Sequence, residues 1–196
     1  PIIWDRFPND LTGAYGNSGR RTLLKPGKPG VIAAALMSAR KGDTILLQSG
    51  TYMEGPPDDD MALRITVDNL VLRSAPGQRA RIIPQGPVTK RGIIIGADNV
   101  MIHGLDLEGF TSAGIGVGTP QKTIKGTILS DLRLNLPGAG QWVDGISIWP
   151  DFRSRKEPAV DGLLIRDVKV IGASLGISCN AGPCNNLWLE NIKVQS

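Results

Sequence analysis

The sequence contains few of the residues that build the common metal and redox centres. Its 196 residues include one histidine and two cysteines, and aromatic residues make up 5%. Three such ligands are too few for a structural zinc site, which takes four. No apolar run approaches about 18 residues, so no membrane span is predicted. No Lys/Arg-rich run is present either, which argues against nucleic acid as a partner.

What the sequence does have is typical of a single globular domain with many turns. Hydrophobic residues make up 41% and charged residues 20%, with 25 glycines and 14 prolines. This mixture favours many short strands over long helices. The formal net charge is +4 and the pI is about 9.3. Such an excess attracts polyanions, including acidic polysaccharides, although ordinary surface charge explains it equally well.

One sequence pattern recurs along the chain. Each copy starts with Asn or Gly and contains two short alternating strands joined by a two-residue bend. The full copies start at Asn99, Gly126, Gly162 and Asn186, and Asn69–Arg73 matches the first half. Alternation of period two sends every second side chain inward. The predicted inward columns are Ile102, Leu129, Ile165, Leu189 and Leu105, Leu132, Val168, Ile192.

A second pattern, Gly-Ile-x-Ile and its variants, lies between these copies. It occupies residues 92–95, 114–117, 145–148 and 176–179, and we take Thr44–Leu47 and Leu63–Thr66 as its earlier relatives. It predicts a third strand in each coil. Three strands per coil and about six coils account for residues 43–196, so the sequence predicts an all-β solenoid.

The two ends of the solenoid differ. The apolar stretch from Val31 to about residue 41 predicts a helix that caps the N-terminal end of the core, after an N-terminal extension of residues 1–29. The solenoid domain is therefore predicted over residues 30–196. At the other end the sequence stops just after a strand, which leaves self-association, a continuing polypeptide or an exposed edge as the alternatives.

The two cysteines, Cys179 and Cys184, are five positions apart around a Gly-Pro turn. A disulfide between them would be a weak sign of an oxidising compartment. The alternative places Cys179 on an inward strand position as a buried thiol and Cys184 in the turn. The sequence leaves both interpretations open.

Gly42–Tyr52, which follows an Ala-rich helix, resembles the first coil of the pectin lyase-like proteins, and the repeated Asn/Gly-x-x-Ile units continue the likeness over about residues 30–196. The resemblance implies a right-handed parallel β-helix whose Gly-Ile-x-Ile strands form the floor of a substrate groove. That superfamily includes polysaccharide lyases, polygalacturonases, epimerases, phage tailspikes and adhesins, so function depends on the site.

One short motif resembles the Asp-Gly-Ile of polygalacturonases, namely Asp144–Ile146. The paired aspartates expected one coil later are replaced by Leu175–Ser178, and the Gly-His-Gly element is missing. A hydrolase of the polygalacturonase type is therefore not expected.

The outward residues of the floor strand are predicted to be Leu46, Arg64, Ile94, Gly116, Ser147 and Ser178. The segment around the fourth of these strands is rich in aromatic and charged residues, which suits stacking on sugar rings and binding of hydroxyls and uronates. The predicted catalytic residues are Asp144, Asp151, Arg153, Lys156 and Arg64. The predicted substrate-binding residues are Trp142, Trp149, Phe152, Arg155, Ser147, Ser178 and Asn180.

These residues predict an extracellular, secreted or virion-associated protein that binds and cleaves an acidic, uronate-containing polysaccharide. We expect β-elimination, with a base and stabilising cations, ahead of hydrolysis by the carboxylate pair Asp144 and Asp151. The alternative is a non-catalytic binding or structural module of a tailspike or adhesin, or a self-assembling solenoid. A homotrimer is the expected assembly for a tailspike. Ca²⁺ is the only cofactor considered, and no metal ligands are assigned.

Overall fold

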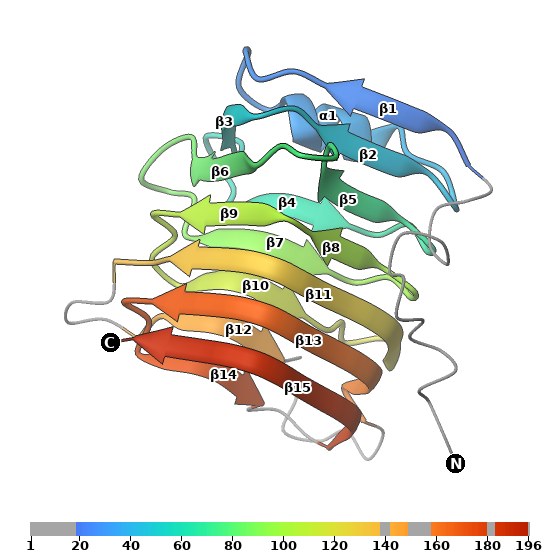
Figure 1. Cartoon of the computed structure of the whole chain (residues 1–196), viewed down its shortest axis with the longest axis vertical. Coiled ribbons are helices and arrows are strands. Elements are labelled where there is room, and N and C mark those ends of the chain that lie inside the picture. The colour runs from blue at the N-terminus through green and yellow to red at the C-terminus, as the bar shows by residue number, and fades with distance from the viewer. Residues whose placement is uncertain (1–18, 138–141, 149–157, 180–182, 196) are drawn as a thin grey trace.

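The computed structural model describes residues 19–137, 142–148, 158–179 and 183–195. These residues form strands β1–β15 and one helix, α1 (Figure 1). The bounds are β1 Arg21–Leu24, α1 Val31–Met37, β2 Thr44–Leu47, β3 Gly50–Glu54, β4 Met61–Ile65, β5 Val71–Ser74, β6 Ala80–Pro84, β7 Arg91–Ile95, β8 Met101–His103, β9 Leu105–Glu108, β10 Ala113–Val117, β11 Ile124–Asn135, β12 Asp144–Ile148, β13 Val160–Ile171, β14 Leu175–Cys179 and β15 Cys184–Gln195.

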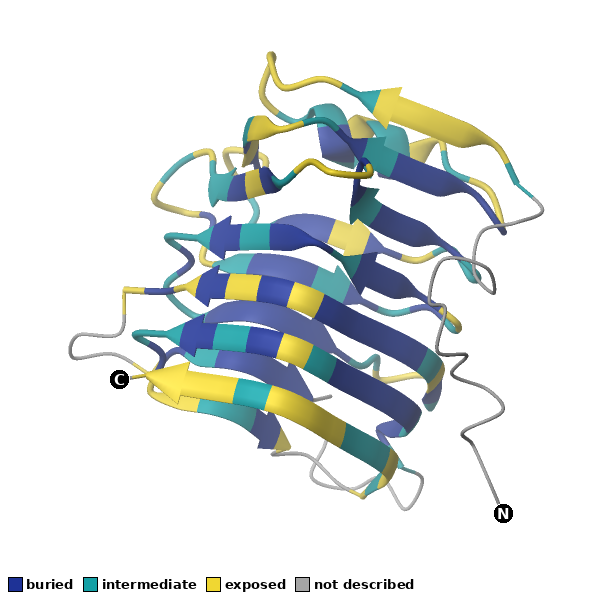
Figure 2. Cartoon of the chain, in the orientation of Figure 1, coloured by how far each residue is buried: buried dark blue, intermediate teal, exposed yellow. Residues whose placement is uncertain are grey.

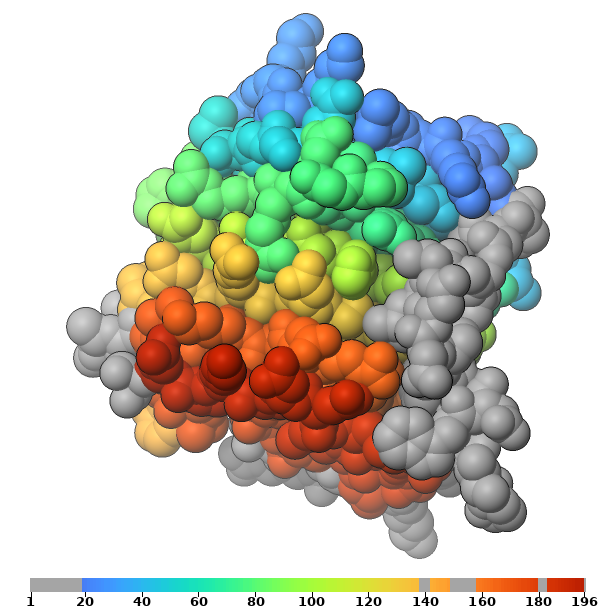
Figure 3. Space-filling model, in the orientation of Figure 1, coloured from blue at the N-terminus to red at the C-terminus, as the bar shows by residue number. Residues whose placement is uncertain are grey.

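The strands stack as coils of a parallel β-solenoid of about six turns, as the repeats predict. A ten-stranded sheet contains both strands of the first repeat pattern, and in β11, β13 and β15 these two strands are continuous. A five-stranded sheet in the order β14-β12-β10-β7-β4 contains the third strand of each coil. All strand pairs are parallel, and the coils follow one another down the long axis as bands of successive colour (Figure 3).

Both predicted inward columns lie in the core, and coil after coil their side chains meet in register. Ile102, Leu129 and Ile165 are 0% exposed, and Leu105, Leu132 and Val168 are at most 1% exposed. Toward the last coil the columns open, because β13 is the only described strand that pairs with β15. As a result Leu189 is 53% exposed.

Two lines of residues with positive φ explain the Asn, Asp and Gly positions of the repeat. One line precedes the first strand of a coil and includes Asn69 and Asn99, whose side chains hydrogen-bond at 3.0 Å. The other lies at the bend, where Asp131 and Asp167 have φ of 50° and 53°. Asn, Asp and Gly adopt this left-handed conformation more readily than other residues do.

The glycine of the Gly-Ile-x-Ile pattern is required by close packing at the corner of each coil. A Cβ on Gly145 would lie 2.4 Å from the Gly176 carbonyl oxygen and 2.7 Å from Val170 Cγ1. A Cβ on Gly114 would likewise lie 2.8 Å from the Gly145 carbonyl oxygen. The glycine of this pattern is therefore explained by lack of space for a side chain, not by a functional site.

Helix α1 covers the N-terminal end of the core, as predicted, and buries Ile32 and Leu36. The fully buried Glu54 carboxylate accepts hydrogen bonds from the backbone N–H groups of Ile32 and Ala33, at 2.8 and 3.1 Å. Burial raises the pKa of Glu54 although these hydrogen bonds act against it. Before α1, β1 pairs in parallel with β2, so part of the N-terminal extension belongs to the sheet.

Two details differ from the sequence-based expectations. Thr44–Leu47, which is β2, pairs with β5 in the ten-stranded sheet, so Leu46 is not part of the groove floor. Cys179 is bonded to Cys184, and it is exposed although it lies in register with the buried Ile148. Among the described strands, β14 pairs only with β12, which leaves Cys179 exposed, and the buried-thiol interpretation is wrong.

Candidate functional site

The five-stranded sheet presents two rows of residues that run along the solenoid axis, and we call these two rows the floor. The first row contains the residue that precedes the corner of each coil, which is glycine in β7, β10, β12 and β14. Its members are Met61, Arg91, Ala113, Asp144 and Leu175. The second row lies three residues further along each strand. Its members are Arg64, Ile94, Gly116, Ser147 and Ser178.

Three predicted site residues meet at the C-terminal end of the floor. Ser178 Oγ donates a hydrogen bond to Asp144 Oδ2 at 2.7 Å and lies 3.0 Å from Ser147 Oγ. Ser147 and Ser178 are 2% and 5% exposed, while Asp144 is partly exposed. The Ser178 hydroxyl, itself bonded to Ser147, holds one oxygen of the Asp144 carboxylate and leaves the other for a ligand.

Trp142 lies two residues before Asp144 and is 81% exposed. The residue between them, Val143, is buried, and its backbone N–H donates to Ser174 Oγ at 3.2 Å. An indole ring so exposed at a fixed point of the backbone costs free energy in water and is a platform on which a sugar ring can stack. Trp142 is thus an exposed aromatic residue two positions before Asp144 in the chain.

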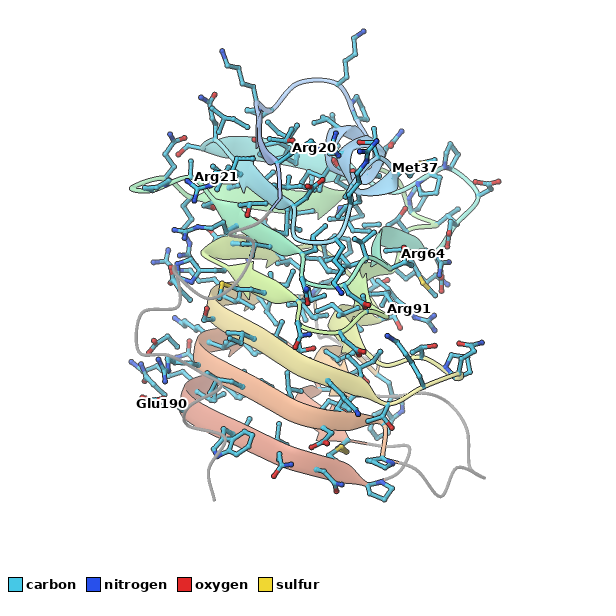
Figure 4. All side chains as sticks on the ribbon, turned by 90° about the vertical axis from the view of Figure 1, so that its right-hand side faces the viewer. Arg20, Arg21, Met37, Arg64, Arg91 and Glu190 are labelled. Carbon is cyan, nitrogen blue, oxygen red and sulfur yellow. A yellow bond between two sulfur atoms is a disulfide. The ribbon has the colours of Figure 1, made fainter. Side chains whose placement is uncertain are left out.

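The N-terminal end of the floor carries two arginines, both paired with acids of the preceding turn. Arg64 Nη2 lies 3.0 Å from Asp59 Oδ2, and Arg91 Nη1 lies 3.3 Å from Asp60 Oδ2. Both arginines project from the same side of the solenoid, opposite Glu190 (Figure 4). Although burial acts to raise the pKa of Asp59, the hydrogen bonds from Arg64 and from the Met61 backbone lower it overall.

A hollow of about 170 Å³ lies between the turns that precede β4 and β7. Pro56, Pro57, Pro87 and Val88 are among the residues that line it. Its volume is well below that of ordinary small-molecule pockets, which span about 300–1,000 Å³. This end of the floor is therefore suited to contact with part of an extended ligand rather than to enclosure of a whole one.

Comparisons with known proteins point to the same architecture. Neither a family model nor a curated protein matches the sequence. Among solved structures, a Parabacteroides merdae protein provisionally named a glycosyl hydrolase matches with a TM-score of 0.57 at 11% identity, over 90% of this chain and 98% of that one. This likeness concerns the parallel β-solenoid fold alone.

Two further structures match at lower similarity. Pectate lyase Pel9A matches with a TM-score of 0.48 at 13% identity, over 80% of this chain and 48% of its own. An alginate lyase from Paenibacillus sp. has the same TM-score and identity, over 87% and 76% of the two chains. Identities this low say nothing about which residues of this chain form a site.

In this β-solenoid, five of the predicted site residues lie on or next to the floor, namely Arg64, Trp142, Asp144, Ser147 and Ser178. The other predicted site residues fall outside the described ranges. They are Trp149, Asp151, Phe152, Arg153, Arg155, Lys156 and Asn180. Sequence reasoning missed Arg91, which shares the first row with Asp144. The available signal was its place just before Gly92, which corresponds to the place of Asp144 before Gly145.

Metal binding gains no support from the described part of the chain. No group of three or more His, Cys, Asp or Glu side chains there is arranged to hold an ion. Of the acidic triplet that starts at Asp58, the other two members are paired with arginines. One carboxylate and two hydroxyls around Asp144 are a poor donor set for Ca²⁺, which takes six to eight oxygens. No described helix is long and apolar enough to cross a membrane.

Proposed function

We propose that this protein binds an acidic, uronate-containing polysaccharide along the floor and cleaves it by β-elimination. The observation that carries the proposal is the group formed by Asp144, its serine partners and the exposed Trp142. Aromatic stacking on the apolar face of a sugar ring, beside a fixed acceptor for its hydroxyls, is a common form of carbohydrate recognition. The net charge of +4 attracts an acidic chain.

Elimination is favoured over hydrolysis because the described part of the floor rows contains a single carboxylate, Asp144. Glycoside hydrolysis ordinarily needs two carboxylates on opposite sides of the bond. Elimination needs one base, which takes the proton from the carbon next to the uronate carboxyl group, and a cation that stabilises the resulting charge. The bond to the glycosidic oxygen then breaks, that oxygen takes up a proton from the protonated base or from water, and a carbon–carbon double bond remains in the sugar.

In this proposal Asp144 is the base, and Arg91 and Arg64 bind uronate carboxylates further along the floor. Arg153, Lys156 and Asp151 remain proposed catalytic residues, and Trp149, Phe152, Arg155 and Asn180 remain proposed contacts to the sugar. The disulfide between Cys179 and Cys184 supports an extracellular setting, because disulfides persist mainly in oxidising compartments.

A second candidate function is polysaccharide binding without cleavage, as in a tailspike or adhesin module. The pairing of Arg64 and Arg91 with Asp59 and Asp60 favours it, because both described floor cations are already neutralised. An acidic ligand would have to displace those acids. Cleavage and binding must therefore be measured separately.

The test is incubation with a panel of uronate polysaccharides while ultraviolet absorbance, reducing ends and binding are followed. We expect absorbance from unsaturated products, loss of at least about a hundredfold in rate for Asp144→Asn, and weaker binding for Trp142→Ala. Lys169→Ala, on the other sheet, is the matched control. Reducing ends without ultraviolet absorbance would mean hydrolysis, and binding without products would mean a non-catalytic binding module. The absence of both binding and products would refute the proposal.

A further inference from the structure

The excess positive charge of the protein is concentrated at the N-terminal end of the solenoid. Residues 19–43, which contain β1 and α1 and which we call the basic cap, carry six basic side chains and one acidic side chain. The rest of the chain carries 16 basic and 17 acidic side chains, so the net charge of +4 comes from the cap. All six basic residues are exposed. They are Arg20, Arg21, Lys25, Lys28, Arg40 and Lys41.

The single acid of the basic cap, Asp43, holds its parts together. Its carboxylate accepts hydrogen bonds from the backbone N–H groups of Arg20 and Arg40, at 2.8 and 2.9 Å, and from the Arg20 guanidinium at 2.8 Å. The same guanidinium donates to the Ser38 carbonyl oxygen at the end of α1, at 2.8 Å. The guanidinium hydrogen bond lowers the pKa of Asp43 to about 2, against the opposing effect of burial. Asp43 is therefore charged at neutral pH and neutralises Arg20.

The basic cap lies beyond the N-terminal end of the floor. Helix α1 packs against β4, which is the last floor strand at that end. Met37, which is 90% exposed on α1, is followed along one side of the molecule by Arg64 and Arg91 (Figure 4). An extended ligand on the floor therefore reaches the cap when it continues past Arg64.

The cations of the basic cap differ from those of the floor in how they are paired. Arg64 and Arg91 on the floor are bound to Asp59 and Asp60. Apart from Arg20, no basic residue of the cap forms an ion pair with another described residue. A cluster of unopposed charges of one sign raises the local concentration of a ligand of the opposite sign. An anionic chain is thus attracted to the cap more strongly than to the floor arginines.

We propose that the basic cap binds acidic groups of an acidic polysaccharide and holds that chain at the N-terminal end of the floor. This inference rests on the proposed function, and it assigns the capture of the chain to a surface separate from Asp144. The cap exposes two large apolar side chains, Leu23 and Met37, which are too few for the apolar face with which helices bind membranes. A polysaccharide is therefore the partner that the cap fits.

Two charge-reversed pairs test the proposal on the full chain. Lys28→Glu with Lys41→Glu changes exposed residues on either side of α1. Arg133→Glu with Lys193→Glu, on the ten-stranded sheet, lowers the net charge equally and leaves Lys169 between two acids. At low salt, we expect polygalacturonate and alginate to bind the cap pair at least about fivefold more weakly than the wild type. The control pair should lose less than about twofold, and salt should reduce the difference.

Cleavage separates this inference from the proposed function. At saturating polysaccharide the cap pair should cleave at the wild-type rate, because the cap does not contact the reacting atoms. Equal binding by the two pairs, while the wild type still cleaves, would overturn the role of the cap alone. Cap-dependent binding without products would support the cap and count against cleavage. Cap-dependent binding to phosphatidylserine vesicles or duplex DNA, but to neither polysaccharide, would overturn the proposal.

Discussion

The two halves of the long strands β11 and β13 belong to the same coils, yet they differ on their outer face. In the first halves, residues 127–130 and 162–165 are all buried (Figure 2). In the second halves, residues 132–135 and 168–171 alternate between buried and more exposed. The inner residues are equally buried in both halves. The difference therefore comes from the outward residues, Ile128 and Leu164 on one side of the bend, and Arg133 and Lys169 on the other.

This difference shows how far the solenoid pattern determines its surroundings. The inward columns build the coil and would be the same whatever lies outside it. An apolar outward column adds a second layer to the fold, and a charged one keeps the face in water. The following predictions test whether the first half is covered and the second is not.

The largest difference is expected from truncating one outward leucine. Leu164→Ala should lower the free energy of unfolding by about 2–5 kcal/mol, as for a core leucine, because the side chain is 1% exposed. Ile171→Ala, outward in the second half of the same strand, should cost clearly less. Denaturant unfolding of both variants measures the contrast. Equal losses would mean that the two outer faces are alike.

A smaller effect is expected at the bend between the halves. Asp167 has a φ of 53° and accepts a hydrogen bond from Asn191 Nδ2 at 2.6 Å. Asp167→Ala should cost about 1–2 kcal/mol from backbone strain alone, and Asp167→Gly should cost less because it relieves the strain. Asp167→Asn should be nearest to the wild type. The same unfolding experiment ranks the three variants, and a more stable Ala than Gly variant would contradict the strain argument.

The parts of the fold that could be predicted from the sequence are those that depend on interactions within a single coil. The inward columns, the bend and the corner glycines are each fixed by sterics within a coil, so the sequence alone indicates them. Thr44–Leu47 was predicted in the wrong sheet. Gly42, with a φ of 88°, lies two residues before this strand, just as Asn69 lies two residues before Val71 in the ten-stranded sheet. A glycine occurs at both kinds of corner in this chain, so Gly42 by itself did not indicate to which sheet the strand belongs.

The candidate site was less predictable because it depends on contacts between coils. Asp144 and Ser178 are 34 positions apart, and only the strand register brings them within 2.7 Å. The register follows from coil lengths, which the variable turns obscure. The ion pair of Arg91 and Asp60 was not predicted, because it too joins two different coils. The exposed Trp142, in contrast, could be selected from its aromatic side chain alone.

The charged outer face of the second half offers a gain in stability rather than a loss. Arg133, Lys169 and Lys193 are direct neighbours in register, and like charges in such positions repel. Lys169→Glu should therefore raise the free energy of unfolding by about 0.2–1 kcal/mol at low salt, and the gain should shrink as salt screens it. A loss of stability would show that this face, too, is covered.

The last contrast depends on pH and involves His103, on the outer face of the first half. Burial, together with the charge of Arg73, lowers its pKa below the ordinary value of 6.5. The unfolded chain therefore binds the proton more readily than the folded one. The stability that this group contributes is complete above pH 6.5 and is lost as the pH falls through its lowered folded pKa.

We expect the wild type to lose free energy of unfolding between pH 8 and pH 5 relative to His103→Gln, which keeps a hydrogen-bonding group for Ser130 but does not titrate. The measurement is the difference between the two proteins at each pH, so that other titrating groups cancel. If that difference is the same at both pH values, His103 is as well solvated as a histidine in water. The first half of the coil would then be as open on its outer face as the second.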